Sequence, residues 1–312
     1  MDLFHNLALG FGVAGTPFNI LLCFVGVFLG TVIGVLPGIG PMTGVALLIP
    51  ICFGFPPTSA VILMAGIYYG AMYGGSTTSI LVNVPGESSS VVTCLDGHEM
   101  AKQGRAGPAL AAAAIGSFIA GTFATIMLMA FGPLCAKIAL RFGPPEFFAL
   151  MVMALTVVTS LAGRSLLKAL YATLSGLAIA MVGSDLQSGA QRFTFGNPQL
   201  MDGIEFLVVA IGLFALTEVF INISEMKNAK DVSTEKIQGG LWLTKADWKR
   251  FWPSCTRWTL SGFFVGGVAG AGAAVASFVS YGIEKRFSKH KKELGTGAIE
   301  GVTGPESANN AA

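Results

Sequence analysis

The chain has 312 residues, of which 53% are hydrophobic, only 12% are charged and 41 are glycine. A soluble domain carries about twice that charged fraction, so the composition excludes an ordinary soluble enzyme, and the lack of a Gly-X-Y period excludes collagen. The net charge of +2 is small, and no basic patch is interleaved with stacking aromatics, which excludes a nucleic-acid-binding module.

The first apolar block covers residues 18–54, which is too long for one span of a bilayer core about 30 Å thick. It is interrupted by Pro37-Gly38-Ile39-Gly40-Pro41, so the sequence predicts a glycine-broken helix here. The N-terminus lacks the basic region of a signal peptide, so we expect this block to remain in the mature protein. A second span is predicted at residues 58–84, and a polar stretch, 85–107, follows it.

Four further apolar segments complete a first membrane repeat unit, residues 1–223. They are predicted as spans at residues 108–136, 144–162, 164–183 and 203–223. A hydrophilic basic loop, residues 224–258, comes next. Its tryptophans, Trp242, Trp248, Trp252 and Trp258, are expected at the headgroup boundary.

The next apolar segment, residues 259–283, lies between two basic stretches. Lys and Arg gather on the cytoplasmic side of membrane proteins, and a single crossing would place one stretch on the wrong side. One interpretation is that the segment enters the membrane and returns at its glycine-rich centre, so that both flanks stay cytoplasmic. The alternative is a single span that violates the rule.

An internal repeat is the most informative feature of the chain. The glycines of the first block, Gly30, Gly34 and Gly38, recur with the same spacing as Gly262, Gly266 and Gly270, and residues 259–312 therefore read as the start of a second, incomplete repeat. A Glu-Ser motif follows each copy, at residues 84–90 and more loosely at 304–310. We name such a series of glycines, spaced by four residues, a glycine ladder. Close packing between two helices would by itself explain one ladder. Repeated apolar segments broken by Gly and Pro are instead typical of a transporter's binding site.

These features predict a solute site that uses backbone, hydroxyl and amide donors and no Lys or Arg. A broken helix exposes free N–H groups that bind anions, and glycine lets a ligand approach the backbone. The expected substrate-binding residues are Pro37, Gly38, Gly40, Thr43, Ser76, Thr77, Thr78, Asn83, Gly86, Ser88, Ser89 and Ser90. Their expected counterparts in the second repeat are Gly270, Gly272, Glu306, Asn309 and Asn310. An ordinary polar helix end remains the alternative.

Glu87 is the only acidic residue between Asp2 and Asp96. If Glu87 lies at membrane depth it is costly and functional, as a proton site or a cation ligand, with Asn83 beside it. At the edge of a loop it would be an ordinary solvated residue.

Enzyme chemistry is not expected, because the chain has no HExxH, no nucleophile elbow and no intramembrane aspartate pair. His98 is expected at the surface of a polar loop, and His5 and His290 have no ligand-spaced partners. The five cysteines form no CxxC pair and read as small apolar side chains. No cofactor or metal is predicted.

At the level of motifs, the chain resembles the large permease subunit of the tripartite tricarboxylate transporter family. The resemblance is carried by three stretches, Gly34-Val35-Leu36-Pro37-Gly38, Tyr68-Tyr69-Gly70-Ala71-Met72-Tyr73-Gly74-Gly75-Ser76 and Asn83-Val84-Pro85-Gly86-Glu87. It continues through Asp96-Gly97 and returns at Tyr281-Gly282-Ile283-Glu284-Lys285 and from Glu300 to Asn310.

The resemblance implies an all-α, polytopic permease of the bacterial inner membrane. It also implies two partners, a small membrane subunit and a periplasmic solute-binding protein. The implied substrates are small di- and tricarboxylates, moved with a gradient of Na⁺ or H⁺ and without ATP.

Two departures from the family pattern bear on this expectation. Members of the family run to about 500 residues, whereas this sequence stops inside the second Glu-Ser motif, and Ala269-Gly270 stands where Pro-Gly is usual. A non-transporting truncated permease and a channel-like pore are therefore the alternative functions.

Overall fold

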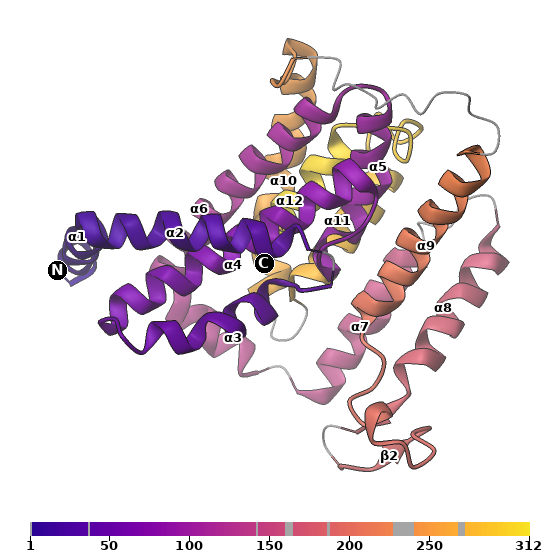
Figure 1. Cartoon of the computed structure of the whole chain (residues 1–312), viewed down its shortest axis with the longest axis horizontal. Coiled ribbons are helices and arrows are strands. Elements are labelled where there is room, and N and C mark those ends of the chain that lie inside the picture. The colour runs from indigo at the N-terminus through magenta and orange to yellow at the C-terminus, as the bar shows by residue number, and fades with distance from the viewer. Residues whose placement is uncertain are drawn as a thin grey trace.

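The computed structural model describes residues 2–36, 38–141, 143–159, 165–185, 188–226, 240–267 and 272–312, and these ranges are almost entirely helical (Figure 1). The predicted all-α class is confirmed. The longer helices are α1 (Asp2–Ala14), α2 (Pro17–Gly34), α3 (Pro41–Cys52), α4 (Pro57–Val82), α5 (Val91–Lys102), α6 (Ala106–Ala139), α7 (Pro144–Thr159), α8 (Leu166–Ala180), α9 (Phe206–Met226), α10 (Lys245–Gly267), α11 (Gly272–Phe287) and α12 (Glu300–Ala311).

Short elements complete the described chain. They are two 3₁₀ turns, η1 (Ser88–Ser90) and η2 (Pro198–Leu200), and an antiparallel pair of two-residue strands, β1 (Gly183–Ser184) and β2 (Gln191–Arg192). In the described ranges, two stretches are long and apolar enough by themselves to cross a bilayer, Pro17–Gly34 and Ala106–Gly132.

Two regions expected to be polar loops contain helices. Helix α5 occupies most of the predicted polar stretch 85–107, and α10 begins at Lys245, inside the predicted loop 224–258. Low hydropathy was the reason for both predictions. Both helices bury polar side chains against protein, which hydropathy does not register, and Trp258 of α10 is buried rather than placed at a headgroup boundary.

The first glycine ladder joins α2 to α4. A Cβ at Gly30 would lie 2.2 Å from the carbonyl oxygen of Ile67, and a Cβ at Gly70 would lie 2.2 Å from that of Val27. Gly34 and Gly74 meet in the same way one turn further along. Only glycine allows two backbones to approach this closely, so this ladder acts as a packing surface.

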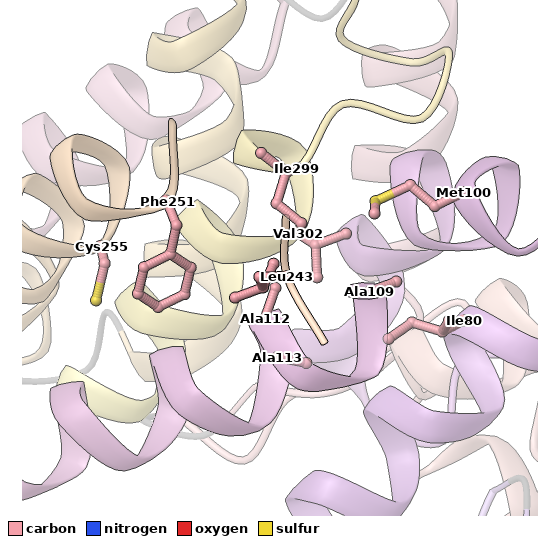
Figure 2. Close-up of a cluster of buried hydrophobic side chains, with 10 residues drawn as sticks. All are labelled: Ile80, Met100, Ala109, Ala112, Ala113, Leu243, Phe251, Cys255, Ile299 and Val302. Atoms are coloured by element: carbon pink, nitrogen blue, oxygen red, sulfur yellow. The ribbon is translucent and has the colours of Figure 1, made fainter. Parts of the chain in front are cut away.

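A second close approach joins α10 to α12. A Cβ at Gly262 would lie 2.5 Å from the carbonyl oxygen of Ala308, and one at Gly266 would lie 2.2 Å from Cα of Ala312. The buried apolar cluster of Figure 2, which includes Phe251 of α10 and Val302 of α12, packs these helices against α6. The C-terminal segment is thereby fixed in the middle of the helical body.

Helices α10 and α11 run back along each other. The indole nitrogen of Trp258 donates to Oε1 of Glu284 over 2.7 Å, and Arg257 Nη1 contacts the same oxygen at 3.0 Å. Residues at both ends of the segment 259–283 are therefore neighbours. The described parts of the segment thus lie alongside each other, which is the geometry that the enter-and-return interpretation requires.

Candidate functional site

Glu306 of α12 places a carboxyl group at the meeting point of four helices. Its Oε1 accepts hydrogen bonds from Ser76 of α4 (2.8 Å) and Thr93 of α5 (2.5 Å), and Ser117 of α6 lies 3.4 Å from Oε2. The side chain is only 1% exposed. Every one of these donors is a neutral hydroxyl.

Glu87 is buried in the segment between α4 and η1. The segment comes close to both glycine-rich helices, because a Cβ at Gly86 would lie 2.3 Å from Cα of Gly75 and 2.7 Å from the carbonyl oxygen of Gly34. Glu87 and Ser90 form a reciprocal capping box, and the hydroxyl of Ser89 donates to the Glu87 carboxylate. These hydrogen bonds fix the conformation of residues 87–90.

Side chains of the two Glu-Ser motifs meet. Asn309 Nδ2 donates to Ser89 Oγ over 3.4 Å, and Asn310 Nδ2 donates to Ser117 Oγ over 2.9 Å. We name this cluster the Glu-Ser junction. Its members come from both halves of the chain and are Ser76, Glu87, Ser89, Thr93, Ser117, Glu306, Asn309 and Asn310.

The electrostatics of the junction are unusual for buried acids. In the described part of the chain, neither Glu87 nor Glu306 forms an ion pair, whereas Glu284 and Glu300 each contact an arginine. Moving an isolated carboxylate out of water is expensive, and hydroxyl donors offset only part of that cost. The ionised form of either carboxyl is therefore costly at the junction.

A cavity of about 590 Å³ borders the junction. It lies between α2, α4 and α6, and its lining is largely apolar, with Val27, Tyr69 and Phe118 among the side chains. Ser117 and Asn310 contribute to the lining, so the cavity reaches the polar cluster. Its volume is in the range of small-molecule sites, about 300–1,000 Å³.

Several predicted site residues lie away from the junction. Thr43 is exposed on α3, and no atom lies within 4 Å of a Cβ placed at Gly40. The hydroxyls of Thr77 and Thr78 donate to carbonyls of their own helix, those of Tyr73 and Gly75. Pro37 and Gly270 lie outside the described residues.

The remaining predicted residues shape the backbone around the site. Gly38 and Gly272 have φ of 91° and 68°, in the left-handed region that favours glycine, and Asn83 ends α4 with φ of 56°. Ser88 is half-buried and Ser90 serves the capping box. The two motifs also differ in conformation, because residues 85–87 are not helical whereas Pro305 and Glu306 lie inside α12.

Sequence reasoning missed Thr93 and Ser117. Thr93 lies in the stretch that was read as a polar loop, and Ser117 is one hydroxyl in a long apolar helix. Their spacing from Glu306, 213 and 189 residues, left no local pattern to detect. His98 is also corrected: it is buried, its Nδ1 lies 3.1 Å from the carbonyl oxygen of Ile80, and its Nε2 has no partner.

Asp96 of α5 holds the start of α12 in place. Its carboxylate accepts the hydroxyl of Tyr281 (2.7 Å) and the backbone N–H groups of Gly295, Gly297 and Ala298, the last two at 2.8 Å. A negative charge before a helix N-terminus is favourable, and the anchor is fully buried. The position of Glu306 at the junction therefore depends on α5.

Ion pairs join the polar part of α10 to the start of α12 and to Arg105, which precedes α6. Arg250 makes two hydrogen bonds to Glu300, 2.7 Å and 2.6 Å long, and one of 2.7 Å to Glu293. Arg105 Nη2 contacts Asp247 Oδ1 at 2.5 Å. Burial alone would raise the pKa of Asp247, but hydrogen bonds from Thr244 and the Arg105 guanidinium hold the pKa below its ordinary value.

Comparison with known proteins identifies similar sequences. Residues 20–312 match the family described as the tripartite tricarboxylate transporter TctA family. An Agrobacterium vitis protein described as "Uncharacterized 52.8 kDa protein in TAR-I ttuC' 3'region" is 53% identical over 312 residues, which is 100% of this chain and 62% of that protein. A second one, "Uncharacterized protein in TAR-II ttuC' 3'region", is 59% identical over 51 residues, 16% of this chain and 21% of that protein. No solved structure matches the chain.

Proposed function

The chain belongs to the tripartite tricarboxylate transporter TctA family, and from this premise we propose that it is the permease subunit of a binding-protein-dependent secondary transporter. It is an all-α, polytopic membrane protein and a transporter component. We propose further that it imports small di- or tricarboxylates across the bacterial inner membrane with a gradient of H⁺ or Na⁺. Its partners in this proposal are a small membrane subunit and a periplasmic solute-binding protein.

The observation that carries the proposal is the Glu-Ser junction. Ser76 and Thr93 come from the first part of the chain and meet Glu306 from the last, inside the helical body. Transporters with repeats bind substrate and coupling ions where the repeats meet, close to breaks in helices. The hydroxyls, amides and free backbone groups near the junction are suitable donors for a carboxylate substrate.

We assign the coupling cation to the carboxyls of Glu87 and Glu306. Both are buried and neither forms an ion pair within the described residues, so a proton or Na⁺ at the pair lowers the cost of their charge. A bound cation also makes the adjoining space less repulsive to an anionic substrate. Binding of the cation therefore strengthens binding of the carboxylate substrate, and binding of the substrate strengthens binding of the cation.

The bordering cavity offers a route by which a small solute could reach the junction. Its lining includes Ser117 and Asn310, which contact each other and both contact Glu306. The mostly apolar lining does not favour a bound anion within the cavity itself. We therefore place the substrate at the junction rather than in the cavity.

Uptake into vesicles tests this function. Vesicles that contain the chain and its two partners are given labelled citrate and a panel of other di- and tricarboxylates, with a pH gradient, a Na⁺ gradient or neither. The proposal expects saturable uptake that requires one of the two gradients. Flux that never saturates would identify a channel, and no uptake of any acid would identify a non-transporting fragment; each result overturns the proposal.

Accessibility tests the alternating-access form of the mechanism. Cysteines are introduced at Gly40 and Ser89 and labelled from either side of the membrane, with and without citrate. We expect the labelled side to change with substrate at Ser89. Equal protection at both positions under every condition contradicts alternating access.

A further inference from the structure

Exposed cations gather where α11 ends and the loop to α12 begins. Consecutive turns keep this segment compact, because Lys291 N donates to the Ser288 carbonyl over 3.3 Å. In the next turn, Glu293 N donates to the His290 carbonyl over 2.9 Å. We name the exposed side chains of this segment the basic patch, and its members are Arg286, Phe287, Lys289, Lys291 and Lys292.

The loop that follows the patch is fixed to the helical body. The N–H of Gly295 donates to the carboxylate of Asp96, and Nε2 of Gln103 donates to the Thr296 carbonyl over 2.7 Å. In Figure 1 the loop before α12 accordingly lies next to α5. The backbone that carries the cations is thus already ordered, and an ordered surface loses less conformational entropy when it binds a ligand.

The acidic residues of the same segment and its neighbours are paired with other arginines. Glu284 contacts Arg257 at 3.0 Å, and Glu293 and Glu300 both contact Arg250. Among the residues that the structure describes, none of the four cations of the basic patch forms an ion pair. The patch therefore carries a positive charge that its described surroundings do not neutralise, and this charge attracts anions.

The distribution of charge along α10 and α11 indicates how deep these helices lie in the bilayer. Residues 258–267 of α10 and 272–283 of α11 include no charged side chain. Charges begin at Arg257, ten residues from the inner end of α10, and at Glu284, twelve residues from that of α11. At 1.5 Å per residue these distances are about 15–18 Å, which matches half of a hydrocarbon core about 30 Å thick.

Phe287 then lies at the level of the lipid headgroups. It follows Gly272 by fifteen residues, or about 22 Å, which is the outer limit of the headgroup layer in a bilayer about 40–45 Å thick. Its ring is 70% exposed, and Cζ of Arg286 lies 5.6 Å from the ring centre. The three lysines of the patch come directly after this ring. Clusters of cations immediately beyond a membrane helix are typical of surfaces that bind anionic lipids.

We propose that the basic patch binds the phosphate headgroups of anionic phospholipids in the cytoplasmic leaflet. Basic segments mark the cytoplasmic side of a membrane protein, and that leaflet carries the negative surface potential. A soluble phosphate offers the same charge but no interface to receive the exposed ring of Phe287, which favours the lipid as the occupant. The inference goes beyond the proposed function, because headgroup binding requires neither a substrate nor an ion gradient.

Thermal unfolding of the purified chain in a neutral detergent tests this surface. Phosphatidylglycerol is titrated into the protein, with phosphatidylcholine as the zwitterionic lipid and glycerol phosphate as the soluble source of the same group. We expect the unfolding midpoint to rise with phosphatidylglycerol alone, because a ligand that binds only the folded state stabilises it. An equal rise with phosphatidylcholine would indicate binding of acyl chains, and an equal rise with glycerol phosphate a site for soluble phosphate. Either result, or no rise at all, overturns the proposal.

Charge variants locate the binding on the patch. The double variant Lys291→Gln/Lys292→Gln should weaken apparent affinity for phosphatidylglycerol about thirtyfold, at roughly fivefold for each lysine. Lys291→Arg/Lys292→Arg keeps both charges and should retain the affinity. The matched control, Lys137→Gln/Arg141→Gln, removes two exposed cations at the far end of α6, a helix about 50 Å long that begins beside α10, and should change nothing. Equal losses in the two glutamine variants, or none in the first, overturn the proposal.

Discussion

The hydroxyl of Ser76 donates to Oε1 of Glu306 over 2.8 Å, so two side chains 230 residues apart share one buried hydrogen bond. Ser76 belongs to a glycine-rich segment of α4, and Glu306 belongs to α12. The carboxyl is neutral when protonated and needs a compensating cation when ionised. The first prediction concerns this group.

Glu306→Gln should strongly reduce gradient-driven uptake while leaving the protein in the membrane. The amide has nearly the shape of the carboxyl, but it takes up no proton and carries no negative charge to balance a cation, and it removes the cost of a buried charge. We therefore expect uptake to fall by at least about tenfold, as for loss of a charged group worth roughly 1.5–3 kcal/mol, without a lower unfolding temperature. Glu99→Gln is the control, since Glu99 is exposed and pairs with Lys102. If uptake and unfolding temperature fall together, the role of Glu306 is structural.

Gly30→Ala should destabilise the pair of helices α2 and α4. The added Cβ would lie 2.2 Å from the Ile67 carbonyl oxygen, which is backbone and cannot move aside. Overpacking costs about 1–3 kcal/mol, and that outweighs the gain of about 1 kcal/mol in helix propensity. The control, Gly212→Ala in α9, meets nothing within 4 Å and should be neutral or stabilising. Thermal unfolding in detergent compares the two, and equal midpoints would contradict the packing role.

Asp96→Asn should loosen the start of α12. Asparagine keeps one acceptor oxygen, and its amide group faces backbone N–H groups that now have no partner. We expect a loss of about 3 kcal/mol in unfolding free energy, and about 1 kcal/mol for Tyr281→Phe, which removes one hydrogen bond. Hydrogen exchange at Gly297 and Ala298 should accelerate in the aspartate variant. Unchanged protection at both amides would show that other contacts hold this segment.

Stability should decrease in acid through Asp247. Its pKa is lower in the folded protein than the ordinary value of about 3.9, so the folded state favours the ionised form. The contribution is complete above that ordinary value and is lost as the pH falls through the folded pKa. Between pH 5 and pH 3, Asp247→Asn should therefore show a smaller fall in unfolding midpoint than the wild type. If the unfolding midpoints of the variant and the wild type fall equally with pH, the contact with Arg105 adds no pH dependence to stability.

The helical class could be predicted from the sequence because apolar length and helix breakers are local signals. The break after Gly34 is one example, because Pro37 to Pro41 interrupt an apolar run, and the packing face of the first glycines is another, since spacing by four specifies a small-residue face. Glu306, Asn309 and Asn310 were predicted as counterparts of the first motif, and the structure brings them beside Ser76 and Ser89.

The rest of the junction depends on tertiary contacts that carry no local pattern. Thr93 and Ser117 became site residues only because α5 and α6 pack against α12. The prediction that placed His98 at the surface was wrong because hydropathy cannot distinguish a solvated polar stretch from one buried against protein. Thr43 was included for its hydroxyl, but its place on α3 leaves it exposed.

The Asp96 anchor sets a condition on the order of synthesis. Its acceptor atoms are made about 200 residues before their donors, since Gly297 follows Asp96 by 201 positions. At about 5–20 residues per second, the ribosome needs roughly 10–40 seconds to supply them. The contacts between α5 and the start of α12 therefore cannot form until Ala298 has been synthesised.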